Sequence, residues 1–329
     1  MLKNILFVTD NCEYEKEYTI KNRDSEGNTK FSRDEMIDAL KLISKNVQVT
    51  YSLKEANKLI QEYPDIFVVT TYYGTASPDS KSLLPAICSA NHVKYWGADS
   101  YTQMICNDKY LSKSYIKEFG LNPAPGNIFY SPNNPANKAI IHSMEKPLIV
   151  KPNFGGGSNG IANKSLTHTD EETIAMIKEL YKYQKMPILV EKYISGYEVS
   201  LVIIGNKKEI LFCEESELLI QSKNYFDNEI FGLENKKVNT QYKAYRKSNH
   251  IDKKTREKII ALFQSFDKVE FMRADCRITS SGQIFIIELS PDCYVGTKGA
   301  FYETVKQMGI SFPDMIKIMI DNSINNQNY

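Results

Sequence analysis

Short apolar runs alternate with amphipathic segments through the first hundred residues. The run NILFVT at residues 4–9 has the length and composition of a buried parallel strand. A helical period follows over residues 32–43, and we expect this helix to have Ser32 as its N-cap and acids in its first turn. The same rhythm continues with strands at 47–51 and 66–70 and helices at 54–62 and 80–89. Alternating strands and helices of this kind predict an α/β lobe with a parallel sheet.

The rest of the chain predicts further strands and helices. A helix opens at Lys109 and stops at Gly120, just before a proline-rich linker at 122–126. Residues 214–252 lose clear periodicity, and so long an irregular segment is typical of a functional lid or a disordered loop. The other expected elements are strands at 147–151, 186–193, 198–204 and 209–213 and helices at 253–266, 302–308 and 312–321.

Two apolar runs near residue 280 predict antiparallel strands joined by a Ser281-Gly282 turn. Arg273, Asp275 and Glu288 place charges in these runs, and buried charges are costly unless they are paired or bind a cation. Arg273 and Asp275 share a face, and a hairpin can bring Glu288 beside them. Two interpretations are open at this point. The acids hold Mg²⁺, which prefers oxygen ligands, or Arg273 pairs with both acids in a structural ion network.

A glycine-rich run, PNFGGGSNG, follows a short strand that ends in Lys151. Glycines leave the backbone amides free to wrap an anion, and Lys151 can reach the same phosphates. The run lacks the GK[ST] ending of a Walker A motif, and a hairpin loop is the alternative. Further on, Glu191 and Glu198 lie on strands that suit an adenine slot with a ribose contact; the alternative is that both acids face solvent.

Composition narrows the class of protein. The 329 residues include 41 basic and 40 acidic side chains, and this net charge of +1 gives no electrostatic case for nucleic acid or a membrane as the main partner. The six cysteines have no CxxC or zinc spacing, so we expect reduced thiols in a cytoplasmic protein. No run approaches the roughly eighteen apolar residues that span a bilayer. No GxGxxG follows the first strand, which argues against a dinucleotide site there.

The motifs occur in a specific order along the chain: a lysine that opens a helix, a lysine before a glycine loop, VEKY-x-x-GxE, and then RxD and ExS on a hairpin. This set resembles the ATP-grasp superfamily, and within it the D-alanine-D-alanine ligases. The resemblance implies an α/β fold with α+β lobes. They would be an N-terminal parallel lobe at 1–106, a central nucleotide-binding lobe at 107–195 and a C-terminal antiparallel lobe with helices at 196–329.

The resemblance implies roles for individual residues. Arg273 would steady the oxyanion of the reaction, and Lys151 would offset charge on the transferred phosphate; these are the expected catalytic residues. ATP would be held by Lys109, Lys151, Gly155, Gly156, Gly157, Ser158, Glu191, Tyr193, Ile194 and Glu198. Mg²⁺, with Mn²⁺ as an alternative, would be held by Asp275, Glu288 and Ser290.

The metal motif departs from the family pattern. The family's acid-x-asparagine pair appears here as Glu288-Leu289-Ser290, so the third metal ligand is a weaker neutral oxygen unless Asp292 compensates. Two interpretations follow, an altered metal geometry or a damaged catalytic centre.

The substrate-binding segments depart as well. Residues 11–15 replace the family's GG-x-S-x-E segment, and residues 72–79 replace its HG-x-x-GEDG loop. Gly299-Ala300 takes the place of the serine-leucine pair that holds the substrate carboxylate. We therefore expect a product other than D-alanyl-D-alanine, with candidate substrate contacts at Lys298, Gly299, Glu15 and Tyr73.

These observations predict an ATP-dependent carboxylate-amine ligase that acts through an acyl phosphate on an amino acid or small peptide. Its partners would be small carboxylate and amine substrates, and the family resemblance implies a homodimer. The glycine flap at 155–157 and the segment 214–252 would close the site against water. Two alternatives are a nucleotide-binding pseudo-ligase with a regulatory role and a carboxylate kinase that stops at the acyl phosphate.

Overall fold

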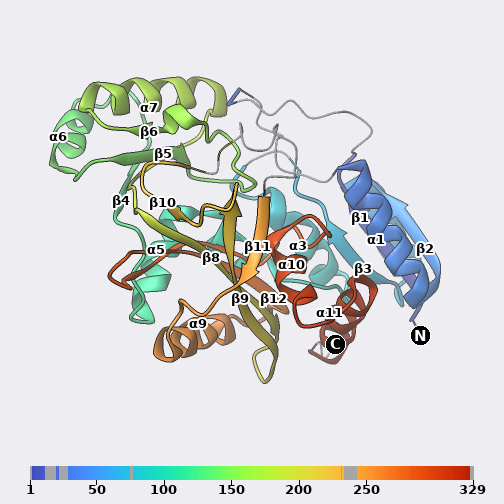
Figure 1. Ribbon diagram of the computed structural model, residues 1–329. Coiled ribbons are helices and arrows are strands. Elements are labelled where there is room, and N and C mark those ends of the chain that lie inside the picture. Colours follow the sequence, from blue (N-terminus) through green and yellow to red (C-terminus); the bar gives the residue numbers. More distant parts are fainter. Residues whose placement is uncertain are drawn as a thin grey trace.

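The computed structural model describes residues 2–11, 20–21, 29–74, 77–230, 232 and 243–326. Its strands form three sheets, each covered by helices (Figure 1). In this view the parallel sheet lies at the right, a second sheet with its helices lies at the upper left, and a third lies between and below them. The fold is of the mixed α/β class that the sequence predicts.

The parallel sheet has the order β2-β1-β3, and both pairs are parallel, as predicted. All residues from Ile5 to Val8 of the central strand are fully buried, so the sheet is covered on both faces. Its elements are β1 (Leu2–Thr9), α1 (Lys30–Ile43), β2 (Ser44–Thr50), α2 (Leu53–Glu62), β3 (Phe67–Thr71), the 3₁₀ helix η1 (Ser80–Ser82), α3 (Leu83–Ala90) and α4 (Ser100–Asn107).

Helix α1 begins earlier than predicted. Its N-cap is Thr29, and Ser32 is the third helical residue. The two form a capping box in which each backbone amide donates to the other side chain, at 2.9 Å and 3.2 Å. The first turn contains no acid. The prediction of Ser32 as the cap was wrong because two hydroxyl residues three positions apart both satisfy orphan amides of this turn.

The second sheet carries the glycine-rich loop, and we call it the flap sheet. Its order is β4-β7-β5-β6, and all pairs are antiparallel. Helix α7 covers it by burying Ile177 and Leu180 in one core with Val150 and Val190 (Figure 1). The elements are β4 (Gly126–Phe129), α6 (Ala136–Ser143), β5 (Leu148–Pro152), η2 (Asn163–Ser165), β6 (Leu166–Thr167), α7 (Asp170–Gln184) and β7 (Ile188–Lys192).

The third sheet contains the predicted hairpin, and we call it the hairpin sheet. Its order is β11-β9-β8-β12-β13, with β10 paired to β8. The turn at Gly282 has φ +82, which glycine adopts without strain, and the hairpin prediction is confirmed. The elements are α5 (Lys109–Glu118), β8 (Gly196–Gly205), β9 (Ile210–Ile220), β10 (Tyr225–Phe226), β11 (Lys243–Lys247), α9 (Lys253–Ser265), β12 (Phe271–Ile278) and β13 (Ile284–Ser290).

The prediction of irregular structure over residues 214–252 was wrong for much of the described part, because β9 continues to Ile220, β10 follows, and β11 pairs with β9. Residues 231 and 233–242 of this segment lie outside the described residues. The prediction failed at β9 because the acids of this strand are buried: Glu215 and Glu217 are 1% and 3% exposed. Arg256 and Arg246 neutralise them at 2.9 Å and 2.6 Å, so a polar stretch forms a buried strand.

The last two helices, α10 (Ala300–Lys306) and α11 (Phe312–Asn326), return to the parallel sheet. Met315 and Met319 of α11 share a core with Ile5 of β1 and Val202 of β8. One core therefore joins the beginning, middle and end of the chain. Within the residues described, no helix combines the length and apolarity needed to cross a membrane, and the five cysteines are free thiols.

Candidate active site

A cavity of about 730 Å³ is lined by residues of the flap sheet and the hairpin sheet, and also by Thr29, Tyr73 and Lys81, which lie outside the strands of the parallel sheet. Every predicted site residue that the structure describes lines it, whereas Glu15 lies outside the described residues. Such a volume accommodates a small-molecule ligand. The predicted residues in its wall are Tyr73, Lys109, Lys151, Gly155, Gly156, Gly157, Ser158, Glu191, Tyr193, Ile194, Glu198, Arg273, Asp275, Glu288, Ser290, Lys298 and Gly299.

The hairpin sets Asp275 of β12 directly opposite Glu288 of β13, as predicted. Arg273 donates to both oxygens of Asp275, at 2.8 Å and 2.7 Å, and the Ser200 hydroxyl donates to Asp275 Oδ1 at 2.8 Å. Burial would lower the pKa of Arg273, but the charge of Asp275 raises it well above its usual value. The guanidinium is therefore charged and fixed in orientation.

Glu288 is paired with Lys109, whose Nζ lies 3.1 Å from Glu288 Oε1. Burial would raise the pKa of Glu288, but the charges of Lys109 and Lys151 outweigh it and lower the pKa. Arg273 therefore pairs with one hairpin acid while the other is held by a lysine. The second acid stays ionised beside two lysines that the sequence assigns to phosphates.

Glu191 of β7 is 1% exposed and is shared by two ammonium groups, those of Lys113 and Lys151. Burial would raise the pKa of Glu191, but Lys151 and Lys113 lower it. Burial lowers the pKa of Lys113 despite the attraction of Glu191. The prediction placed Glu191 at an adenine slot; the structure commits its carboxylate to a buried ion network that fixes Lys151 in the cavity wall.

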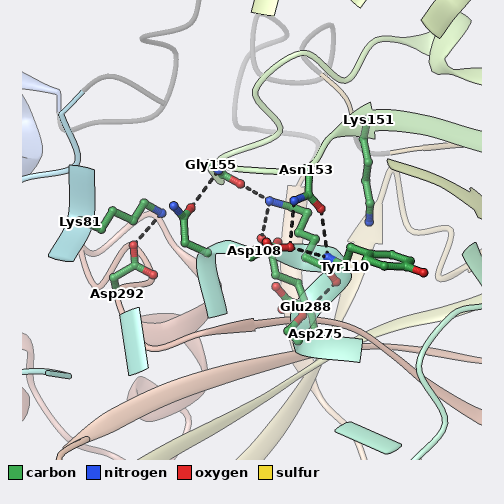
Figure 2. Close-up of polar contacts among 12 residues, drawn as sticks. Lys81, Asp108, Tyr110, Lys151, Asn153, Gly155, Asp275, Glu288 and Asp292 are labelled. Carbon is green, nitrogen blue, oxygen red and sulfur yellow. Dashed lines mark hydrogen bonds and ion pairs between the residues drawn. The ribbon is translucent and has the colours of Figure 1, made fainter. Parts of the chain in front are cut away.

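Asp108 and Asn153 interlock the start of α5 with the end of β5 (Figure 2). Asp108 is the N-cap and accepts from the amides of Tyr110 and Leu111 at 3.1 Å and 2.9 Å. Asn153 donates to Asp108 Oδ1 at 2.8 Å and accepts from the Tyr110 amide at 3.0 Å. Lys109 follows the cap directly, so its helix start is held beside the end of β5 and its side chain reaches the Gly155 carbonyl just after that strand.

The glycine flap is tied to the same helix start. The Gly155 amide donates to Asn107 Oδ1 at 2.9 Å, and the Gly155 carbonyl accepts from Lys109 (Figure 2). Gly155 and Gly157 have φ +84 and +60, values that side chains rarely tolerate, and Ser158 adopts φ 60. The loop therefore has the backbone freedom expected of an anion-wrapping flap.

The predicted adenine wall is apolar and closed. Tyr193 and Ile194 are 5% and 6% exposed. The Tyr193 hydroxyl donates to the backbone carbonyl of Glu229 at 2.6 Å, which anchors the segment after β10. Glu198, the predicted ribose contact, accepts from Arg277 Nη2 at 2.7 Å. Arg277 also lies 5.4 Å from the centre of the Tyr193 ring, so it joins the acid to the wall.

The sequence as a whole is similar to a family of known ligases. The family model described as D-ala D-ala ligase C-terminus matches residues 115–321, more than half of the chain. The chain belongs to this family. It is an ATP-grasp protein of the D-alanine-D-alanine ligase type.

Individual relatives agree with this membership. The D-alanine–D-alanine ligase A of Bacillus cereus is 20% identical over 281 residues, which are 85% of this chain and 88% of the relative. A D-alanine–D-alanine ligase of Wigglesworthia glossinidia brevipalpis is 26% identical over 285 residues, 84% and 75% of the two chains.

Solved structures share the fold of this ATP-grasp chain. The Bacillus anthracis D-alanine–D-alanine ligase complexed with ATP has a TM-score of 0.73 at 16% identity and covers 99% of this chain and 98% of its own. The VanG D-Ala:D-Ser ligase of Enterococcus faecalis has a TM-score of 0.66 at 17% identity, with 98% and 100% covered.

Mg²⁺ is the metal that the ATP-grasp family implies. In the part of the chain that is described, no three His, Cys, Asp or Glu side chains gather as a ready-made metal site, so Asp292 does not complete a cluster with Asp275 and Glu288. The two hairpin acids still fit the ion. Asp275 receives three hydrogen bonds while a carboxylate has about four lone-pair sites. Glu288 is ionised, and Mg²⁺ usually keeps waters and phosphates in its shell.

Sequence reasoning missed three charged residues of this ATP-grasp site: Lys113, Arg277 and Lys81. Lys113 lies one helical turn after Lys109, so the shared helix face was an available signal. Arg277 lies two residues after Asp275 on β12, which places both on one face of the strand. Lys81 follows a loop that differs from the family motif, and the sequence offered no signal for its partner.

Proposed function

We propose that this chain is an ATP- and Mg²⁺-dependent ligase that joins the carboxylate of one small molecule to the amine of another. The observation that carries the proposal is the set of charges around one cavity: two opposed acids, an arginine fixed by one of them, and lysines beside a glycine flap. The relatives named D-alanine–D-alanine ligases and the ATP-complexed structure support the nucleotide and the reaction class.

The first step is phosphoryl transfer. The substrate carboxylate attacks the γ-phosphate of ATP, the bond to ADP breaks, and an acyl phosphate forms. Lys109 and Lys151 offset the negative charge that gathers between the two anions. Mg²⁺ held by Asp275, Glu288 and the Ser290 hydroxyl would add to that neutralisation.

The second step forms the amide. The amine attacks the acyl carbon, inorganic phosphate leaves with the electron pair of the broken bond, and the former amine releases a proton. Arg273 is charged and oriented by Asp275, so it can face the tetrahedral oxyanion. No side-chain nucleophile is needed. The flap at Gly155 to Gly157 covers the acyl phosphate, which water would otherwise hydrolyse.

We propose a product other than D-alanyl-D-alanine. Lys298 is exposed at the cavity wall, with its Nζ 4.2 Å from the centre of the Phe31 ring. The loop that carries it is fixed to α1, because Glu35 accepts from the Thr297 amide at 3.0 Å. A lysine next to Gly299 favours a substrate that presents a second carboxylate to this end of the cavity.

The test is phosphate release from ATP and Mg²⁺ in the presence of D- and L-amino acids, dipeptides and small acids, singly and in pairs, with mass detection of the product. We expect ADP formation that depends on an acid and a new mass equal to acid plus amine minus water. Asp275→Asn should lower turnover at least a hundredfold, about 3 kcal/mol of barrier, while the protein stays folded.

Other outcomes reject the proposal. ADP release that depends on an acid but yields no amide would identify a carboxylate kinase. ATP binding with no turnover across the panel would identify a pseudo-ligase, the outcome that Ser290 in place of the family asparagine would explain.

A further inference from the structure

Lys81 and Asp292 form an ion pair in the cavity wall that the proposed nucleotide chemistry does not use. The Lys81 Nζ lies 2.6 Å from Asp292 Oδ2, and the two side chains are only 8% and 19% exposed. Both line the cavity. The other acids of the wall are paired with cations already assigned to ATP, metal or oxyanion, or placed in the adenine wall: Glu191 with Lys113 and Lys151, Glu198 with Arg277, Asp275 with Arg273, and Glu288 with Lys109.

The pair lies at the Glu288 end of the cavity, where the proposed phosphoryl transfer takes place. Figure 2 shows Lys81 and Asp292 on one side of Glu288 and Lys151 on the other. Lys81 is close enough for its charge to contribute to the lowered pKa of Glu288, although burial and the charges of Lys109 and Lys151 have larger effects. A substrate beside this pair would therefore stand next to the transferred phosphate without overlapping the nucleotide lysine.

The two residues come from distant parts of the chain that both depart from the family motifs. Lys81 lies on η1, after the loop that replaces HG-x-x-GEDG. Asp292 follows Ser290, the replacement for the family asparagine. Both residues therefore lie beside segments in which this chain departs from the family motifs.

Asp292 is also incompletely satisfied. Its Oδ2 is buried and lies 2.6 Å from Lys81 Nζ, which is one contact for a carboxylate with about four acceptor sites. A buried acceptor in this state calls for a donor. A buried ion pair by itself is weak evidence of stabilisation, because desolvation offsets the attraction.

We propose that Lys81 and Asp292 recognise the zwitterionic backbone of a free amino acid, which is the substrate whose carboxylate is phosphorylated. The carboxylate lies against Lys81 toward Glu288, and the ammonium donates to Asp292. The charges of Lys81, the ligand carboxylate, the ligand ammonium and Asp292 then alternate in sign around the site. An ammonium held by a carboxylate is kept protonated and is a poor nucleophile, so this position suits the carboxyl donor rather than the attacking amine. This inference rests on the proposed ligase function.

The test measures binding to the full chain loaded with adenylyl imidodiphosphate and Mg²⁺ by calorimetry. The probes are glycine and the D- and L-amino acids, each compared with its deaminated acid and its decarboxylated amine; for alanine these are propionate and ethylamine. We expect at least one amino acid to bind ten times more tightly than both of its analogues. If none does while the ATP analogue binds, the inference is rejected and the nucleotide site stands. If the ATP analogue does not bind either, the proposed function fails as well.

Single variants separate recognition from a structural role. Asp292→Asn should remove the preference for the amino acid over its deaminated acid, and Lys81→Gln should remove the preference over its amine. Lys164→Gln breaks an exposed ion pair of 2.6 Å with Glu179 and serves as the matched control, expected to keep both preferences. Affinity for the ATP analogue reports that each variant is folded.

The charge-swapped variant Lys81→Asp with Asp292→Lys completes the design. It keeps an ion pair but reverses the charges offered to the ligand, so we expect the amino-acid preference to stay lost. Recovery of that preference in the swap, or its persistence in both single variants, would make the pair a structural latch and overturn the inference.

Discussion

Glu191 is one carboxylate between two ammonium groups, and all three side chains are buried. Glu191→Gln keeps the shape of the side chain but leaves Lys113 and Lys151 without an anion. Removing one partner of a buried ion pair costs about 3–5 kcal/mol. We therefore expect the free energy of unfolding to fall by this order in urea titrations, and calorimetry to show at least tenfold weaker binding of an ATP analogue.

Glu179→Gln provides the control for this prediction. Glu179 pairs with Lys164 at 2.6 Å, but both side chains are substantially exposed. Exposed pairs contribute about 0–1 kcal/mol. Equal losses of stability in the two variants would show that the buried network does not hold Lys151 in place.

The acid sensitivity of the fold follows from the pKa values of the same carboxylates. Burial opposes ionisation of Glu191 and Glu288, but the charges of neighbouring lysines outweigh burial and lower both pKa values below the usual value near 4.5. A carboxylate with a lower pKa in the folded state stabilises the fold above its unfolded pKa, and this stabilisation is lost as the pH falls through the folded pKa. The free energy of unfolding should therefore fall as the pH drops below about 5.

Two variants test the sign of this effect in urea titrations at several pH values. Glu191→Gln should make the acid loss smaller, because it removes one of the groups responsible. Glu270→Gln should make the loss larger. Burial raises the pKa of Glu270 despite the charge of Lys268, so its protonation stabilises the fold on acidification. The same pH dependence in both variants and the wild type would contradict this account.

At the scale of the element, the N-cap of α5 links helix stability to the nucleotide site. Asp108→Ala removes the acceptor for two amides of the first turn and the partner of Asn153. Asp252→Ala removes the cap of α9, which lies outside the cavity wall. Each variant should lose about 1 kcal/mol of stability. Only Asp108→Ala should weaken binding of an ATP analogue, since Lys109 follows this cap; equal affinities in calorimetry would refute the link.

The hairpin could be predicted from the sequence because its information is local. A Ser-Gly turn fixes where the strands reverse, and alternation then sets Asp275 against Glu288. The continuation of β9 could not be predicted, because Glu215 and Glu217 read as exposed until Arg256 and Arg246 arrive from later segments. Local patterns give elements, whereas burial of charge depends on tertiary partners.

The site shows the same division. The order of the motifs predicted that the lysines, the flap and the hairpin acids share one cavity, and they do. It did not predict which lysine or arginine pairs with which acid. Lys113 reaches Glu191 between helix α5 and strand β7, and Lys81 reaches Asp292 between η1 and the segment after β13. Neither contact has a spacing that a sequence pattern records. The pairs that decide charge and specificity are those the sequence alone leaves open.

At the scale of the whole molecule, one core joins the parallel sheet to the hairpin sheet. Trp96, the single tryptophan, is 1% exposed and lies 5.4 Å from the Phe271 ring of β12. Met319 of α11 is fully buried in the same core. Tryptophan fluorescence reports this junction, and circular dichroism reports all helices. Because the core is shared, we expect the two unfolding curves to coincide in urea.

Met319→Ala tests whether this junction controls the stability of the entire chain. Truncating a buried methionine to alanine costs about 2–5 kcal/mol through lost burial and the cavity left behind. If the core is shared, the fluorescence and circular dichroism transitions should move together to lower urea, whereas Met308→Ala, at a side chain 46% exposed, should leave both nearly unchanged. A fluorescence transition that moves alone would mean that α11 and the parallel sheet unfold independently of the sheet that carries the hairpin acids. The cavity would then lack a rigid wall on the side of Lys81, because that lysine is held to Asp292 across this same junction.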